Sequence, residues 1–220
     1  MDVTVLLPRE FEHCYQEHVA EKFRQLCTVQ EVFFEKLLTK DKFIQTVGSS
    51  DAVVLTLEPI DREVLEALPD LRLIANFGAG YDNVDLAAAK DLQVEVTNAP
   101  GANASSVAEM ALSLMLSCCR HIPFLDSQTR KGIWTLMPGM ELRGKTCGVI
   151  GLGKIGKELV KMLSGFDVRV MAYEPFRDEA FARQWNVTFA DLDQIACEAD
   201  IITLHCPRQN TSLAGIFSVG

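Results

Sequence analysis

The segment GVIGLGKIGKELV, residues 148–160, decides the fold of the second half of this chain. The apolar run 146–150 leads directly into three glycines, and the amphipathic pattern of a helix follows them. A strand, a glycine-rich turn and a helix in this order are typical of the G-x-G-x-x-G loop that binds dinucleotides. In such a loop Gly151 makes the tight turn, Gly153 lets backbone N–H groups approach a pyrophosphate, and Gly156 lets helix and strand pack closely.

Glu174 stands where a dinucleotide loop of this kind places its acidic partner. It follows the predicted strand 168–173 and lies 18 residues beyond Gly156, a spacing that suits a carboxylate bound to the adenine ribose hydroxyls. Because a carboxylate repels a 2′-phosphate, NAD is favoured over NADP, and Arg177 nearby softens that preference. The alternatives are an ordinary strand-end charge for Glu174 and a solvated lysine, instead of a phosphate contact, for Lys154.

Apolar runs of strand length alternate with helix-length segments along the chain, which predicts the α/β class. The runs are continuously apolar, so we predict doubly wound parallel sheets covered on both faces. The predicted strands are 3–8, 28–33, 52–57, 71–77, 94–98, 146–150, 168–173, a short one at 187–190, and 200–206. The predicted helices are 11–26, 35–47, 61–68, 85–90, 105–127, 154–165, 178–184 and 191–198.

The order of these elements predicts two α/β units, which divide near residues 98–104 and are assigned to 1–100 and 101–220. The helix predicted over 105–127 carries apolar residues on most of its sides, including Met110 and Leu114, which favours burial between layers. The segment that follows it contains several glycines and prolines and is expected to be an irregular connector.

Composition limits the partners and the compartment. A formal net charge of −9 and a pI of about 5.0 disfavour nucleic acid and anionic membranes. The N-terminus lacks the pattern of a signal peptide, and no apolar run approaches the roughly 18 residues of a membrane-spanning helix. The seven cysteines include no Cys-x-x-Cys pair, so we expect buried, reduced thiols in a cytoplasmic protein and no metal site.

A second glycine loop lies in NFGAGYDNVD, residues 76–85. It follows a predicted strand, and the exposed amides of Gly78-Ala79-Gly80 make it a candidate anion site at the carboxyl end of a parallel sheet. Taken alone, the segment is equally consistent with a plain strand-to-helix turn.

The order of GAGYDNVD, NAPGANASSVAE, KGIW, ELRGKTCGVIGLGKIG and AYEPF resembles the D-isomer-specific 2-hydroxyacid dehydrogenases, a family that includes phosphoglycerate dehydrogenases and glyoxylate/hydroxypyruvate reductases. The resemblance covers about residues 50–207. It implies a flavodoxin-like substrate domain, a Rossmann NAD-binding domain, and interconversion of a 2-keto acid and a D-2-hydroxy acid. It also implies a homodimer formed largely through residues 103–145.

The resemblance further implies which residues contact the ligands. The amides of Ala79 and Gly80 bind the substrate carboxylate, and Asn103 lies beside it; capping of the following helix, shared with Ser105 and Ser106, is the alternative for Asn103. The family pattern places these further residues at the NAD site: Val107, Lys154, Ile155, Glu174, His205, Cys206 and Pro207. We expect His205 to be a wall residue of the nucleotide pocket and not a catalyst.

The sequence departs from the family pattern soon after Pro207, and the family's arginine, glutamate and histidine have no match in it. We therefore expect an incomplete Rossmann domain containing the first half only, with the strand at 146–150 as an open edge. We also expect no catalytic residue on the chain and impaired turnover. The alternatives are a non-enzymatic, NAD-binding regulatory protein resembling the family's corepressors, and a fragment that pairs with an intact relative.

Overall fold

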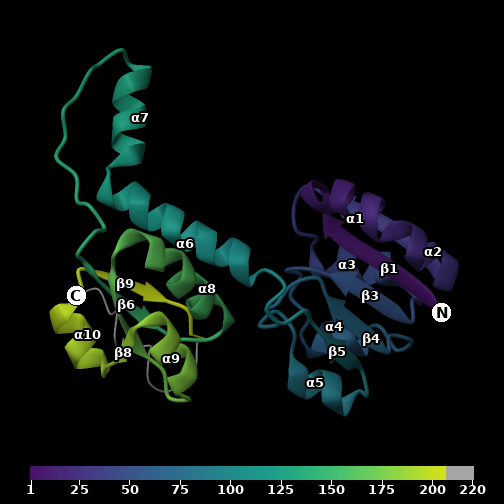
Figure 1. The fold of residues 1–220 in the computed structure, drawn as a ribbon. Coiled ribbons are helices and arrows are strands. Elements are labelled where there is room, and N and C mark those ends of the chain that lie inside the picture. Colours follow the sequence, from purple (N-terminus) through teal and green to yellow (C-terminus); the bar gives the residue numbers. More distant parts are fainter. Residues whose placement is uncertain (207–220) are drawn as a thin grey trace. The chain divides into compact units, whose positions relative to one another are not determined.

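The computed structural model describes residues 1–206 and divides the chain into two compact units, Met1–Ala102 and Asn103–Gly220. Both units are α/β, with parallel sheets and intervening helices (Figure 1). Pro207, predicted to line the NAD site, lies outside the described residues.

The first unit has a sheet of order β2-β1-β3-β4-β5, in which every pairing is parallel. This is the flavodoxin-like strand order, as predicted. Its strands are β1 (Asp2–Pro8), β2 (Thr28–Phe34), β3 (Ala52–Leu55), β4 (Leu73–Asn76) and β5 (Glu95–Thr97). Its helices are the 3-10 turn Arg9–Phe11, α1 (Glu12–His18), α2 (Ala20–Leu26), α3 (Lys40–Val47), α4 (Arg62–Glu66) and α5 (Leu86–Asp91).

Strand β1 explains why this sheet is buried on both faces. Leu6 packs in one cluster with Phe43 of α3, whereas Val5 and Leu7 pack in a second cluster with Tyr15 of α1. Successive side chains of a strand point to opposite faces, so a continuous apolar run requires a helix layer on each side.

The second unit has the sheet order β8-β7-β6-β9, again parallel throughout. Its strands are β6 (Thr146–Ile150), β7 (Arg169–Tyr173), β8 (Val187–Phe189) and β9 (Ile201–Leu204). Its helices are α6 (Ala104–Cys119), α7 (Ile122–Arg130), α8 (Lys154–Leu163), the 3-10 turn Ser164–Phe166, α9 (Glu179–Trp185) and α10 (Leu192–Glu198). This order matches 3-2-1-4 of a dinucleotide-binding sheet.

The expectation that strand 146–150 forms an open edge is wrong. β6 lies between β7 and β9, with Cys147 paired to Val170 on one side and to Ile201 on the other. In chain order, the short strand β8 is the third strand of this sheet and β9 is the fourth. Within the described residues, β9 and β8 are therefore the edges.

The single helix expected over 105–127 is two helices, because His121 takes the left-handed conformation (φ 53°) between α6 and α7. The expected burial on most sides is also wrong. Ala108 and Met115 of α6 are buried, but Met110 is 61% exposed and Leu114 59% exposed. Figure 1 shows α7 continuing beyond α6 and a long extended segment returning from it.

The cysteines only partly fit the expectation of buried thiols. Cys119 and Cys147 are buried, whereas Cys14, Cys118 and Cys197 are exposed; all seven are free. Within residues 1–206, no helix combines the length and apolar character needed to cross a membrane.

Candidate dinucleotide and anion sites

The glycine loop of the second unit is so crowded that two of its glycines are required. Gly151 has φ +96°, and a Cβ there would lie 2.7 Å from the backbone nitrogen of Cys206. A Cβ on Gly156 would collide with the carbonyl oxygen of Gly151. The end of β9 and the first turn of α8 therefore both approach the loop at backbone distance, as the predicted roles of these glycines require.

Gly153 differs from those two glycines because its surroundings are open. It is the N-cap of α8, and among the described residues no heavy atom comes within 4 Å of a Cβ built on it. No side chain caps the helix there. The first turn of an α-helix has N–H groups without intrahelical acceptors and carries the positive end of the helix dipole. A pyrophosphate fits this open, donor-rich turn.

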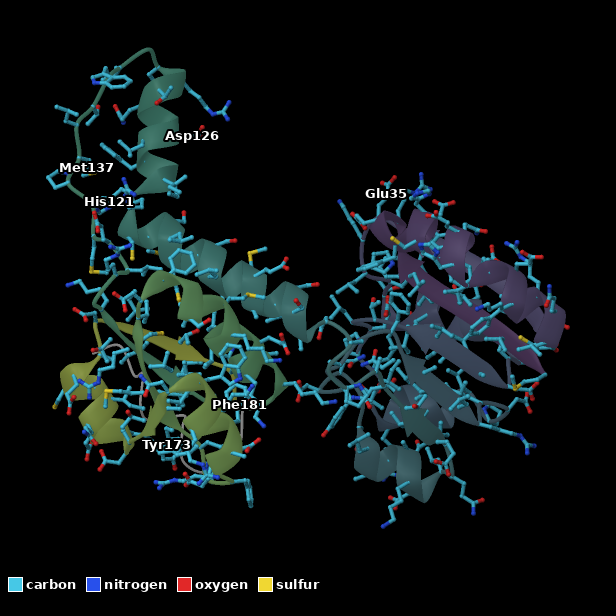
Figure 2. All side chains as sticks on the ribbon, in the orientation of Figure 1. Glu35, His121, Asp126, Met137, Tyr173 and Phe181 are labelled. Atoms are coloured by element: carbon cyan, nitrogen blue, oxygen red, sulfur yellow. The ribbon has the colours of Figure 1, made fainter. Side chains whose placement is uncertain are left out.

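Glu174 comes directly after β7, whose last residue, Tyr173, is labelled in Figure 2. Its carboxylate reaches back to the glycine loop: Oε2 accepts a hydrogen bond from the Leu152 N–H at 2.9 Å, and Oε1 accepts one from the Phe176 N–H at 3.1 Å. The acidic side chain is therefore anchored beside the loop before any ligand arrives. Arg177 stacks on Phe189, with its guanidinium carbon 5.1 Å from the ring centroid.

His205 and Cys206 follow β9 at the mouth of the same loop. The His205 N–H donates to the Ile150 carbonyl oxygen at 2.8 Å, and its ring Nε2 lies 2.9 Å from the Thr203 hydroxyl. Burial lowers the pKa of His205, which favours the neutral imidazole. A half-buried ring suits the wall of a pocket, a role that stays a prediction for His205.

A groove of about 930 Å³ lies between α6 and β9 and brings Val107 and His205 to one surface. Its lining is mainly apolar and includes Met110 and Leu114 of α6 with Ile202 of β9. Met110 and Leu114 belong to the helix that was expected to be buried on most sides.

The second glycine loop, in the first unit, has all three of its carbonyl oxygens bonded inward. Gly78 O accepts from the Ala99 N–H at 2.8 Å, Ala79 O accepts from Asn98 Nδ2 at 2.6 Å, and Gly80 O accepts from Asn76 Nδ2. In the described part of the chain, the N–H groups of Ala79 and Gly80 donate to no protein acceptor. The loop therefore presents amides outward, as an anion site requires. The sequence analysis did not single out Asn76 or Asn98.

Asn103 occupies the N-cap position of α6, but its side chain makes no capping hydrogen bond. The capping alternative is therefore not observed, and the exposed side chain stays available for a ligand. Asn103 belongs to the second unit and the loop of Ala79 and Gly80 to the first.

Glu58 is a buried carboxylic acid of the first unit that sequence reasoning missed. The side chain is 1% exposed, and its Oε2 accepts from the N–H groups of Thr56 (3.2 Å) and Leu57 (3.1 Å). Oε1 has no partner among the described residues. Burial raises the pKa of this carboxyl group.

Known proteins resemble this chain over both of its units. The family model described as "D-isomer specific 2-hydroxyacid dehydrogenase, NAD binding domain" matches residues 112–216. A D-3-phosphoglycerate dehydrogenase of Archaeoglobus fulgidus is 38% identical over 186 residues, covering 83% of this chain and 35% of that protein. A glyoxylate reductase of Korarchaeum cryptofilum is 34% identical over 198 residues, covering 84% and 59%.

The solved apo-structure of D-lactate dehydrogenase from Escherichia coli superposes with a TM-score of 0.82 at 34% identity, over 96% of this chain and 66% of that one. The chain thus spans about a third to three fifths of the two curated relatives and about two thirds of the solved structure. Since sequence and fold agree over nearly its whole described length, the chain belongs to the D-isomer-specific 2-hydroxyacid dehydrogenase family.

Proposed function

We propose that the chain is an NAD-dependent oxidoreductase of the D-2-hydroxyacid dehydrogenase type. Such an enzyme interconverts a 2-keto acid and a D-2-hydroxy acid. The observation that carries this proposal is the open, uncapped first turn of α8 with the Glu174 carboxylate anchored beside it. The outward amides of Ala79 and Gly80 supply the complementary carboxylate site in the other unit. Relatives named as phosphoglycerate dehydrogenase and glyoxylate reductase support the substrate class.

In this proposal the described residues bind and orient the reactants. The N–H groups of Lys154 and Ile155 receive the pyrophosphate, and Glu174 receives the adenine ribose hydroxyls. Ala79 and Gly80 hold the substrate carboxylate. NAD(H), when bound, supplies the hydride chemistry. We assign no proton transfer to His205, because its half-buried ring is bonded to the Thr203 hydroxyl and burial lowers its pKa.

NAD, and not NADP, is the proposed cofactor. A 2′-phosphate at the adenine ribose would meet the Glu174 carboxylate, which Leu152 and Phe176 hold in place. Arg177, the nearby cation expected to soften this preference, is stacked on Phe189.

Calorimetry on the 220-residue chain tests the cofactor site. We expect heat on titration with NAD⁺ or NADH, little with NADP⁺, and at least a tenfold loss of NAD⁺ affinity in Glu174→Gln, which keeps the size of the side chain but loses its charge. Glu179→Gln, an exposed acid on α9, is the matched control. Absence of NAD⁺ binding by folded wild-type protein would disprove the proposal.

Turnover tests the expectation that these residues lack a group for proton transfer. We expect the isolated 220 residues to bind NADH but to reduce glyoxylate or hydroxypyruvate far below the typical enzyme rate of about 10 s⁻¹, because general acid–base catalysis alone contributes roughly 10²–10⁴-fold. A rate within tenfold of that value would overturn the expectation that proton transfer is missing from these residues.

We further propose a cytoplasmic homodimer formed through residues 103–145. In the described structure α7 has no buried side chain, and Trp134 is 91% and Leu136 87% exposed, in the segment that contains Met137 (Figure 2). Exposed large apolar side chains of this kind are typical of an interface. Sedimentation should show a dimer that Trp134→Asp with Leu136→Asp converts to a monomer, while Leu26→Asp, equally exposed on α2, leaves it intact.

A further inference from the structure

Three carbonyl oxygens in succession are bonded inward in the loop Gly78-Ala79-Gly80, and their donors come from two places in the fold, the end of β4 and the two residues that follow β5. The donors are the Ala99 N–H, the Asn98 side-chain amide directly after β5, and the Asn76 side-chain amide at the end of β4. A trans peptide bond points its C=O and the next residue's N–H in opposite directions. Each of these bonds therefore sets the direction of the following amide.

The bond from Ala99 to the Gly78 carbonyl directs the Ala79 N–H outward, and the bond from Asn98 to the Ala79 carbonyl directs the Gly80 N–H outward. The bond from Asn76 to the Gly80 carbonyl directs the N–H of Tyr81 in the same manner. Within residues 1–206 the Tyr81 N–H has no protein acceptor.

Asn76 is itself oriented by a second asparagine. Its Nδ2 also donates to Asn83 Oδ1 at 3.2 Å, and Asn83 Nδ2 donates to the carbonyl oxygens of Thr56 (3.3 Å) and Glu58 (3.0 Å). Asn76 is 6% exposed, yet its Oδ1 has no partner among the described residues. A buried acceptor without a partner costs free energy, so its presence indicates that the side chain is oriented for the loop and not for its own hydrogen bonding.

Resting on the function proposed above, we propose that Asn98 and Asn76 are positioning residues of the substrate site. They aim the amides of Gly80 and Tyr81, so that a 2-keto acid carboxylate meets three N–H donors, those of Ala79, Gly80 and Tyr81. The backbone alone does not dictate this shape, because Gly78 and Gly80 both have ordinary φ values and open surroundings. The asparagine donors, not glycine geometry, make the loop an anion site.

Amide NMR of the ¹⁵N-labelled 220-residue chain tests the proposal, with oxamate as the probe of a 2-keto acid. We expect oxamate to shift the amide resonances of Ala79, Gly80 and Tyr81. Asn98→Leu, which has nearly the same size but no donor, should weaken oxamate binding at least tenfold and should reduce the shift of Gly80 most. Asn98→Gln, which keeps a side-chain amide, should recover part of the affinity. Thr97→Val, on the exposed neighbouring residue, should change nothing.

Calorimetry with NAD⁺ on the same samples separates this proposal from the proposed function. If NAD⁺ binds but oxamate moves none of the three amides, or if folded Asn98→Leu binds oxamate as the wild type does, the positioning proposal is wrong and the cofactor site stands. If Asn98→Leu does not fold, Asn98→Ser, a smaller neutral change, is tested by the same criterion. NAD⁺ failing to bind while oxamate affinity depends on Asn98 would disprove the cofactor site alone.

Discussion

The two glycine loops of this molecule, 78–80 and 151–156, both follow a parallel strand and both present amides, but they are built in different ways. In the second, Gly151 and Gly156 are required, because positive φ and backbone contact leave no room for a side chain. In the first, Gly78 and Gly80 have room for one, and the side-chain amides of Asn76, at the end of β4, and Asn98, directly after β5, set the loop's shape.

This difference shows that glycine can occupy a position in a binding loop for one of two physical reasons. At Gly151 it is the fold that demands glycine, because the end of β9 passes within backbone distance. At Gly153, and at Gly80, the surroundings are open and the fold makes no such demand. A glycine of the second kind leaves space for a ligand. Stability and binding measurements should therefore separate the two kinds.

The largest effect is expected for Gly151→Ala. The left-handed backbone and the collision with the Cys206 nitrogen should together lower the free energy of unfolding by about 3 kcal/mol, and NAD binding should fall with it. Urea unfolding measures the change. Gly165→Ala, at a glycine with open surroundings in the same unit, is the control. Equal stability of the two variants would show that β9 does not approach the loop as described.

Gly153→Ala should separate binding from folding. Its φ of −75° suits alanine and its surroundings are open, so unfolding should change by less than about 1 kcal/mol. The new methyl group would occupy the space through which a pyrophosphate approaches, so NAD⁺ affinity should fall at least tenfold. Calorimetry beside urea unfolding makes the test, and unchanged affinity would remove Gly153 from the proposed site.

Glu58 adds a pH dependence to the first unit. Burial raises its pKa in the folded state, so folding is most favoured below the ordinary glutamate pKa and loses stability as pH rises through the raised value. Glu58→Gln should remove this decline and raise the free energy of unfolding by about 1 kcal/mol at pH 8, with little change at pH 4. Glu95→Gln, on the exposed side of β5, should keep the wild-type slope. A wild-type slope in Glu58→Gln would assign the pH dependence to another group.

Local patterns predicted the parts of this molecule that depend on neighbours in sequence. The apolar runs of β1 and β6 predicted strands buried on both faces, and the spacing of Gly151, Gly153 and Gly156 predicted a strand–turn–helix loop, because each depends on a short segment. The acid at Glu174 followed from the same spacing, and the structure places it beside the loop.

Contacts between distant segments could not be predicted in this way. No local pattern shows that β9 pairs with β6, that the left-handed His121 separates α6 from α7, or which apolar side of α6 stays exposed. The same applies to Asn98, whose partner Ala79 lies 19 residues away across the sheet. The cause is physical: register and packing are decided by tertiary contacts that outweigh local preference.

The smallest effect, and the sharpest test of the comparison, is expected for Gly80→Ala. A Cβ there would meet nothing closer than the Asp82 carboxylate at 3.9 Å, so the free energy of unfolding should stay within about 0.5 kcal/mol of the wild type. If Gly80→Ala instead destabilises the chain as much as Gly151→Ala, both loops are held by glycine geometry and the asparagine donors are secondary. If it leaves stability intact while Asn98→Leu weakens oxamate binding, the first loop is organised by its asparagine donors and the second by its crowded backbone.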